Sequence, residues 1–250
     1  MLNRFVSWTQ LTYRAIGRML IHLLAATIAT DWKEVLKRFL SIRLFFENSR
    51  VICQSHYSFY YLSKELADCS SVLDLGCGHN SLIQFCHVPW SLGIEMFEPY
   101  IQQSRNRNIH SQYIQADVRK LKFRDRSFDA VIALELLEHL NKQEGYELIH
   151  NMESWARKRV VVSTPNGYLP HGCRDNNPFQ VHQSGWEIDE LRNLGFNVYG
   201  VSGLIALRNR EGKMKFKPEI LWQAVSGFTS VLLYRHPELS FELFCVKRIR

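Results

Sequence analysis

Residues 71–80 hold the first group of residues that could do chemistry, and they read Ser-Val-Leu-Asp-Leu-Gly-Cys-Gly-His-Asn. The apolar run around Asp74 predicts a short buried strand that ends in a glycine turn. Because Gly76 and Gly78 lack a Cβ atom, a ligand could approach the backbone closely there. An ordinary dinucleotide site needs a third glycine three residues after Gly78, but Ser81 stands at that position. We therefore expect a ligand site of another kind.

Two more acidic residues close the next two predicted strands. Glu95 ends the stretch Ser-Leu-Gly-Ile-Glu, and Asp117 ends the stretch Ser-Gln-Tyr-Ile-Gln-Ala-Asp. A single acid at a strand end means little, because strand ends commonly meet water. Three successive strands that end in Asp74, Glu95 and Asp117 are hard to ascribe to chance. Ligands bind at the carboxyl ends of strands in open parallel α/β sheets, so we expect these acids to surround one ligand.

Glu135, Glu138 and His139 form the second group of chemically capable residues. They lie in the stretch Ala-Leu-Glu-Leu-Leu-Glu-His-Leu, at spacings that share one face of a helix. Carboxylates together with imidazole suit Mg²⁺, Mn²⁺ or Zn²⁺, so the pattern predicts a divalent metal site. In the alternative interpretation, Glu135 only orders a ligand or caps the helix, and His139 or the later His182 acts alone as a general base.

The elements that must position these groups alternate between strand and helix. This alternation predicts an α/β fold with a doubly wound, mostly parallel sheet of seven strands. A loop over 165–184, which carries His182, is long enough to be functional, and a further helix is expected near 218–234. The expected strands are 72–75, 91–95, 111–117, 127–134, 159–164, 196–201 and 242–247, and the expected helices are 56–67, the stretch after Asn80, 99–106, 143–158 and 186–194.

The first 55 residues are predicted to form a helical N-terminal extension, ahead of a domain at 56–250. The chain has a net charge of +7, and residues 1–50 hold eight basic but only three acidic residues. One interpretation is a basic amphipathic element that touches an anionic membrane surface or a phosphorylated partner. The favoured interpretation is a cap that packs on the domain. The longest apolar run, 19–29, is too short to cross a bilayer, so no transmembrane span is expected.

The six cysteines are scattered along the chain, and no Cys-x-x-Cys pair occurs. This distribution indicates free thiols in a reducing compartment rather than a disulfide framework or a cysteine zinc site. The start of the chain also lacks the layout of a secretory signal. We therefore expect a cytoplasmic protein, with peripheral membrane contact as the alternative.

The series Asp-x-Gly-x-Gly, Glu95 and Asp117 resembles the class I S-adenosylmethionine (SAM) dependent methyltransferases, which have a Rossmann-like domain. The resemblance covers roughly residues 56–200 and the last strand, which is antiparallel in that family. It implies an enzyme with SAM as cofactor. The cofactor-binding set that it implies is Asp74, Gly76 and Gly78 at the methionine end, Glu95 at the ribose hydroxyls, Met96 on the adenine, Asp117 at the adenine amino group with the Val118 backbone beside it, and Glu135 near the methionine end.

A narrower resemblance rests on Glu-x-x-Glu-His, on Ser-Thr-Pro-Asn after it, and on a histidine shortly before a tryptophan. The plant small-RNA 2′-hydroxyl methyltransferases are similar in this whole layout, and the ubiquinone-pathway O-methyltransferases are similar around Glu-x-x-Glu-His. The layout implies a divalent metal held by Glu135, Glu138, His139 and His182. No RNA-binding module is recognisable in the sequence, so the RNA substrate is not carried over.

The expected activity is methyl transfer from SAM to a hydroxyl group of a small molecule, a sugar or a lipid precursor. The protein would mainly position the reactants for in-line displacement. His139 and His182 are the expected catalytic residues, either as metal ligands or as a general base. Two alternatives stay open. The basic charge favours a metal-dependent RNA 2′-hydroxyl methyltransferase, whereas the intact acids at three strand ends argue against a non-catalytic scaffold.

Overall fold

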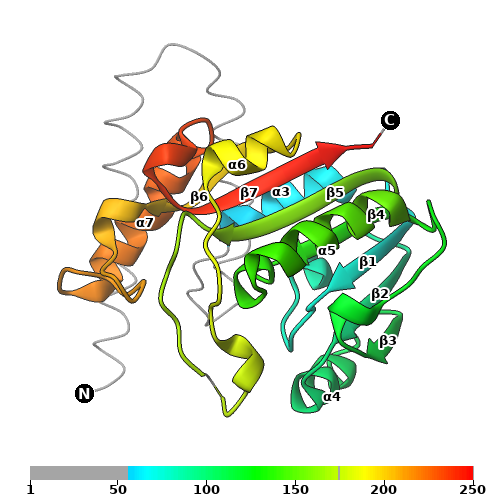
Figure 1. Ribbon diagram of the computed structural model, residues 1–250. Coiled ribbons are helices and arrows are strands. Elements are labelled where there is room, and N and C mark those ends of the chain that lie inside the picture. Colours follow the sequence, from blue (N-terminus) through cyan, green and yellow to red (C-terminus); the bar gives the residue numbers. More distant parts are fainter. Residues whose placement is uncertain (1–55, 174, 250) are drawn as a thin grey trace. The chain divides into compact units, whose positions relative to one another are not determined.

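The computed structural model describes residues 56–173 and 175–249, and the predicted N-terminal extension at 1–55 lies outside these residues. At its centre is a seven-stranded sheet with the strand order β3-β2-β1-β4-β5-β7-β6. Neighbouring strands pair in parallel, except that β7 is antiparallel to β5 and β6. The predicted seven-stranded, mostly parallel α/β sheet is thereby confirmed (Figure 1). The strands are β1 (Ser71–Leu75), β2 (Trp90–Glu95), β3 (Gln112–Gln115), β4 (Phe128–Leu134), β5 (Ala156–Pro165), β6 (Asn197–Leu204) and β7 (Ser240–Arg248).

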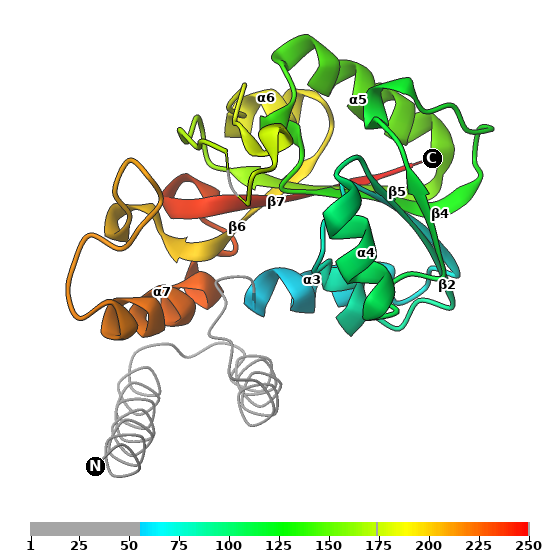
Figure 2. The same ribbon diagram turned by 90° about the horizontal axis from the view of Figure 1, so that it is seen from below.

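Helices cover both faces of this sheet. Figure 2 shows α5 and α6 on one face and α3 and α7 on the other. The α-helices are α3 (His56–Leu66), α4 (Glu98–Asn106), α5 (Lys142–Trp155), α6 (Ile188–Asn193) and α7 (Glu219–Leu233). The last of these confirms the helix expected near 218–234. Over 56–173 and 175–249, no helix combines the length and the apolar character that a membrane span requires.

The connection between β1 and β2 differs from the expectation. The sequence predicts a helix after Asn80, but the structure has only a short 3₁₀ turn there, η1 (Leu82–Phe85). Residues 76–89 are all that join the two strands. A crossover between parallel strands needs a dozen or more residues when it includes a full helix. The glycine turn takes up the first residues of this connection, so too few remain for a full helix. The prediction of a helix at this place was therefore wrong.

The middle of the sheet and the end of the long loop share one hydrophobic core. The strands β1 and β4 are buried along nearly their whole length, because helices cover both faces of a parallel sheet. Trp186, which closes the loop that follows β5, is also fully buried. A Cβ atom on Gly145 of α5 would overlap the Trp186 ring, so glycine lets this ring reach the helix. The loop is thus fixed at its carboxyl end.

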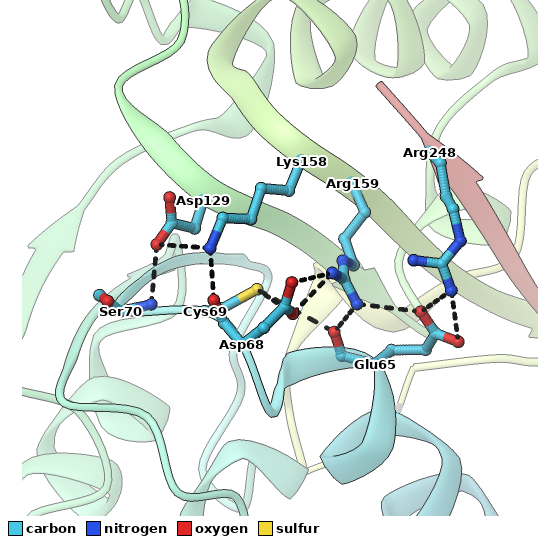
Figure 3. Close-up of polar contacts among 8 residues, drawn as sticks. All are labelled: Glu65, Asp68, Cys69, Ser70, Asp129, Lys158, Arg159 and Arg248. Carbon is cyan, nitrogen blue, oxygen red and sulfur yellow. Dashed lines mark hydrogen bonds and ion pairs between the residues drawn. The ribbon is translucent and has the colours of Figure 1, made fainter. Parts of the chain in front are cut away.

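An ionic cluster fastens α3 to the sheet (Figure 3). Arg159 on β5 is buried, and its guanidinium group donates to the Asp68 carboxylate at 2.6 and 2.7 Å and to the Glu65 carboxylate at 3.2 Å. Arg248 on β7 donates to the same Glu65 carboxylate at 3.2 Å. Two strands therefore hold the carboxyl end of one helix, and this helix leads directly into β1.

Candidate active site

The carboxyl ends of the parallel strands meet at one edge of the sheet, and they bring the two predicted groups of residues together. The strand β1 ends one residue before Gly76, β2 ends at Glu95, and β4 ends one residue before Glu135. The turn after β1 is tied to the neighbouring strand, because the Cys77 N–H donates to the Ile94 carbonyl at 2.9 Å. The arrangement matches the position of ligand sites in open α/β sheets.

The glycine turn has a conformation that explains both of its glycines. Gly76 and Gly78 adopt left-handed φ angles of +64° and +58°, which glycine reaches without steric cost. The Gly78 N–H donates to Glu95 Oε2 at 3.0 Å. A Cβ atom on Gly76 would lie 2.7 Å from Leu136 Cδ1, so the turn also packs on the segment that carries the second group. Three predicted cofactor residues, Gly76, Gly78 and Glu95, thus lie side by side.

Glu95 is buried, and its carboxylate is already well supplied with hydrogen bonds. In addition to Gly78 on Oε2, the N–H groups of Met96 and Phe97 both donate to Oε1 at 2.8 Å. A carboxylate offers about four acceptor positions, so Oε2 has capacity for one further donor. Burial raises the pKa of Glu95, and the three backbone bonds oppose this shift. Glu95 was predicted to accept hydrogen bonds from two ribose hydroxyls. With all three backbone bonds in place, its carboxylate can accept from only one hydroxyl; a second would have to replace a backbone N–H group.

Asp74 lies at the same edge in an apolar setting with a histidine beside it. Ser81 Oγ donates to Asp74 Oδ2 at 2.5 Å, and His110 Nε2 lies 3.3 Å from the same oxygen. Burial raises the pKa of Asp74 to about 7, whereas burial lowers the pKa of His110 to about 4. A Cβ atom on Gly93 would lie 2.7 Å from His110 Cδ2, so glycine on β2 makes room for the ring. Sequence reasoning missed His110 as a partner of Asp74.

The residues predicted at the adenine follow β2 and β3. Met96 is 36% exposed, so its side chain is accessible to a ligand, and Val118 is buried. Asp117 caps the 3₁₀ turn η2 (Val118–Lys120), and its carboxylate accepts from the Arg119 guanidinium at 2.7 to 3.1 Å. Arg119 holds the pKa of Asp117 below its usual range. Asp117 would have to give up part of this pair to accept from an adenine amino group, and that contact stays a prediction.

Glu135 has an unusual backbone conformation directly after β4. Its φ angle of +52° is left-handed, and such conformations in non-glycine residues gather at functional sites. Ser163 on β5 holds it, because the Glu135 N–H donates to the Ser163 carbonyl at 3.0 Å and Ser163 Oγ donates to Glu135 Oε1 at 2.7 Å. The residue is exposed as a whole, but its Oε1 atom reaches Ser163 on the neighbouring strand. Burial of the carboxyl group raises the pKa of Glu135, and Glu242 and Glu138 add to the rise.

Glu138, His139 and His182 form a compact group that we call the carboxylate–imidazole cluster. One ligand atom from each residue lies within 4.8 Å of the other two, and the two ring centroids are 4.8 Å apart. Glu138 and His139 belong to the 3₁₀ turn η3 (Leu137–His139), whereas His182 comes from the loop after β5. Three members of the predicted metal set are thus brought together, and Glu135 is not part of the cluster.

Backbone carbonyl groups fix both imidazole rings of the cluster. His182 Nδ1 lies 2.6 Å from the Leu169 carbonyl oxygen, and His139 Nδ1 lies 3.4 Å from that of Val181. These contacts fit Nδ1–H donors, which leaves Nε2 as the electron-pair donor, as in most metal-binding histidines. Burial lowers the pKa of His139 to about 4 and also lowers the pKa of His182. Both rings are therefore neutral at pH 7, the form that binds a metal ion.

The third member of the cluster, Glu138, contributes a buried carboxyl group. Glu138 is 2% exposed, and its Oε2 atom has no hydrogen-bond partner over residues 56–173 and 175–249. Burial raises the pKa of Glu138, and Glu242 near the start of β7 acts in the same direction. Sequence reasoning missed Glu242, which the strand register places opposite Pro165. An unpartnered carboxyl oxygen beside two neutral imidazoles suits a divalent cation.

The loop after β5 links the cluster to the cofactor edge. His171, which the sequence did not single out, stacks on His182 with ring centroids 5.0 Å apart and an interplanar angle of 26°. Further along the same loop, Asp175 Oδ2 accepts from the hydroxyl group of Tyr100 on α4 at 2.8 Å. The helix α4 begins shortly after Glu95. The loop after β5 therefore reaches from the two imidazole rings to the cofactor side of the sheet edge.

Comparisons with known proteins find methyltransferases. Residues 72–159 match the family model described as "Methyltransferase domain". A probable tRNA methyltransferase 9B from Mus musculus is 31% identical over 100 residues, which are 40% of this chain but only 21% of that protein's length. Among solved structures, a SAM-dependent methyltransferase from Mesorhizobium loti has a TM-score of 0.52 at 15% identity and covers 78% of this chain and 98% of its own.

A second structure, a SAM-dependent methyltransferase from Archaeoglobus fulgidus, has a TM-score of 0.52 at 17% identity and covers 87% of this chain and all of its own. At these identities the structural likeness shows the fold. The family model spans β1, β2, β3 and β4, the strands that carry or adjoin the glycine turn, Glu95 and Glu135. Residues 72–159 therefore match a methyltransferase domain, and the fold is the one seen in SAM-dependent methyltransferases of known structure.

Proposed function

We propose that this chain transfers the methyl group of SAM to a hydroxyl oxygen, with a divalent metal ion held by Glu138, His139 and His182. The carboxylate–imidazole cluster is the single observation that carries the proposal. It combines a buried carboxyl oxygen without a partner and two neutral imidazoles whose Nδ1 atoms face backbone carbonyls. A cluster built only for stability would not need an unpartnered carboxyl oxygen, because such an atom costs about 1–3 kcal/mol.

The glycine turn and its neighbours are the proposed SAM site. Gly76 and Gly78 would let the methionine end approach the backbone, and the remaining acceptor position on Glu95 Oε2 would take a ribose hydroxyl. The exposed Met96 side chain would pack on the adenine. Asp74 and Glu135 would face the methionine end. This assignment is supported by the hydrogen bond between the Gly78 N–H and Glu95, which joins two of the predicted contacts directly.

The proposed chemistry at the acceptor is activation and orientation of a hydroxyl group. A bound divalent ion lowers the pKa of such a hydroxyl and fixes its direction. Ser163 would position Glu135 beside it through its bond to Glu135 Oε1. Because the closeness of Gly76 to Leu136 places the two predicted groups at one edge, the acceptor would stand near the methyl donor, as in-line transfer requires.

The proposed acceptor is a hydroxyl group of a small molecule, a sugar or a lipid precursor. A second candidate is the 2′-hydroxyl group of RNA, and the specific observation that favours it is the likeness to a probable tRNA methyltransferase over 100 residues. The two candidates differ in one simple measurement. Methyl transfer to short RNA oligonucleotides that loses strength steeply with salt would favour the second candidate; transfer to uncharged polyol or phenol acceptors would favour the first.

The metal proposal is tested by metal analysis of chelator-free protein together with two histidine variants. His182→Ala removes one proposed ligand, whereas His150→Ala changes an exposed histidine on α5 and serves as the control. We expect about one equivalent of divalent metal in the wild type and in His150→Ala. In His182→Ala we expect at least tenfold weaker metal binding, in line with the usual effect of disturbing a metal site. Unchanged metal content in His182→Ala, or full activity without metal, would contradict the proposal.

A further inference from the structure

The segment from residue 208 to residue 222 presents a surface that the methyltransferase site does not use. It follows β6, which is an edge strand of the sheet, and it includes the first residues of α7. Figure 1 shows the loop projecting beside α7, away from the body of the sheet. We call it the 208–222 surface. Its exposed basic and apolar side chains are those of Arg210, Lys213, Lys215, Phe216, Lys217 and Leu221, and the half-buried Trp222 adjoins them.

Hydrogen bonds and a cation–π contact anchor the base of this surface on the body of the domain. Arg208 is 4% exposed, donates to the Gly212 carbonyl at 3.3 Å, and lies over the Phe241 ring at 4.8 Å from the centroid. The Asn209 N–H donates to the Lys213 carbonyl at 2.8 Å, which closes the turn. The turn therefore displays its cationic side chains from a scaffold anchored on β7.

Apolar side chains lie among these lysines. Phe216 is 46% exposed and Leu221 is 37% exposed, and the Phe216 ring contacts the Trp222 ring with centroids 4.9 Å apart. Leu232, near the other end of α7, is 43% exposed. Aromatic and aliphatic groups beside lysine are the combination that inserts into the boundary between lipid headgroups and acyl chains.

The charges of the surface favour an anionic partner. Four exposed basic residues face two acidic ones, Glu211 and Glu219, each of which pairs with a lysine. The side chains of Lys213 and Lys217 are 75% and 77% exposed, so these pairs are weak and exchangeable. Lipid phosphate groups could replace the acids without any change in the fold.

The composition of α7 decides between a bilayer and a nucleic acid. A groove for RNA tracks the phosphate backbone with basic residues along its length, but α7 contains no basic residue and only one charged residue, Glu219. Phe216 and Trp222 could each stack on a base, but the exposed Leu221 and Leu232 extend the apolar surface along α7, which suits the acyl chains of a bilayer. We propose that the 208–222 surface docks on a bilayer that contains anionic lipids.

The docking surface borders the candidate active site. A Cβ atom on Gly212 would lie 3.4 Å from Leu169 Cδ2, and the Leu169 carbonyl holds His182 Nδ1 at 2.6 Å. A membrane bound at 208–222 would therefore lie beside the loop that carries the cluster. A lipid-linked acceptor would then lie close to the cluster. This link to the acceptor rests on the proposed function, whereas the docking of the surface on a bilayer does not.

Cosedimentation of the full chain with phosphatidylcholine vesicles, with and without phosphatidylglycerol, tests the docking. Lys213→Gln/Lys217→Gln removes two of the exposed charges, and Lys122→Gln/Arg124→Gln removes two exposed charges elsewhere as a matched control. At about 1 kcal/mol for each lysine near an anionic surface, we expect at least tenfold weaker binding for the first variant and little change for the control. Phe216→Ser/Leu221→Ser should weaken binding also at high salt, because its contribution is apolar.

A second measurement does not depend on the lysine variants. Lipids brominated near the headgroup should quench part of the tryptophan fluorescence of the wild type, and Trp222→Phe should lose that part. Equal vesicle binding by all variants, or quenching that Trp222→Phe leaves unchanged, would overturn the proposal. Binding to short RNA that depends on Lys213 and Lys217, without vesicle binding, would replace it. Vesicle binding needs neither SAM nor metal, so its failure is distinct from failure of the proposed methyl transfer.

Discussion

At the scale of single residues, the acids at the sheet edge differ more in environment than their sequence positions suggest. Glu95 is held by three backbone N–H groups, and Asp117 is held by Arg119. Asp74 has Ser81 as its donor and a neutral histidine, His110, as its neighbour. Similar side chains at similar strand ends therefore have opposite pKa shifts, raised for Asp74 and lowered for Asp117.

The raised pKa of Asp74 predicts how stability without ligand depends on pH. The unfolded chain loses the Asp74 proton near pH 4, whereas the folded chain loses it near pH 7. Folding stability therefore falls as the pH rises from about 4 to about 7. Asp74→Asn cannot ionise and should escape this loss, which amounts to a few kcal/mol for a shift of this size.

Urea unfolding of the wild type and of Asp74→Asn at pH 5 and pH 8 measures this effect. We expect the stability of the variant relative to the wild type to increase by about 2 kcal/mol or more between the two pH values. A difference between the two proteins that is the same at both pH values would show that Asp74 ionises as freely in the folded chain as in the unfolded one.

At the scale of elements, the sequence predicted the strands well and the connections less well. Apolar runs that end in Asp74 or Glu95 identify strands because parallel strands are buried on both faces. The 3₁₀ turn η1 was expected to be a helix, because its apolar residues do not reveal that too few residues remain before β2. The pattern also could not show that Glu135 has a left-handed conformation outside the turn that holds Glu138.

The partners that were missed come from pairings between distant elements. His110 reaches Asp74 because β3 pairs with β2, where Gly93 leaves room for the ring. Glu242 lies near Glu135 and Glu138 because β7 inserts between β5 and β6. Arg119 occupies Asp117 through local hydrogen bonds that no spacing pattern encodes. Sequence reasoning thus found residues that belong to a motif, and it missed those that act through the register of the sheet.

The ionic cluster at the amino end of β5 gives a prediction for stability. Arg159→Met leaves the Glu65 and Asp68 carboxylates without their buried partner, so the free energy of unfolding should fall by about 1–3 kcal/mol. This estimate lies below the usual cost of breaking a buried pair, because the Asp68 side chain is 59% exposed. The matched control is Arg192→Met, whose exposed pair with Asp189 should contribute no more than about 0.5 kcal/mol.

Denaturant unfolding of both variants at neutral pH provides the measurement. We expect a lower midpoint of unfolding for Arg159→Met and a nearly unchanged one for Arg192→Met. If both substitutions cost equally little, the cluster in Figure 3 does not fasten α3 to the sheet in the way described.

At the scale of the whole molecule, the two groups of candidate site residues meet at one edge of a single sheet. The glycine turn follows β1, Glu95 ends β2, and the carboxylate–imidazole cluster lies after β4 and β5. The close approach of Gly76 to Leu136 joins the two regions, and the bond between Asp175 and Tyr100 joins the loop to α4. The fold was predictable from motifs, whereas this joining depends on packing that brings the four strand ends together.

Calorimetry of the full chain with SAM shows whether the glycine turn and Glu95 form a SAM site. We expect saturable SAM binding at micromolar concentrations, binding at least tenfold weaker for Glu95→Gln, and unchanged binding for Glu98→Gln, which changes the neighbouring exposed acid on α4. The loss in Glu95→Gln is expected because a hydrogen bond to a charged acceptor contributes about 1.5–3 kcal/mol. Absence of SAM binding at high micromolar concentration, as a non-catalytic scaffold would show, or equal binding by Glu95→Gln, would contradict the account.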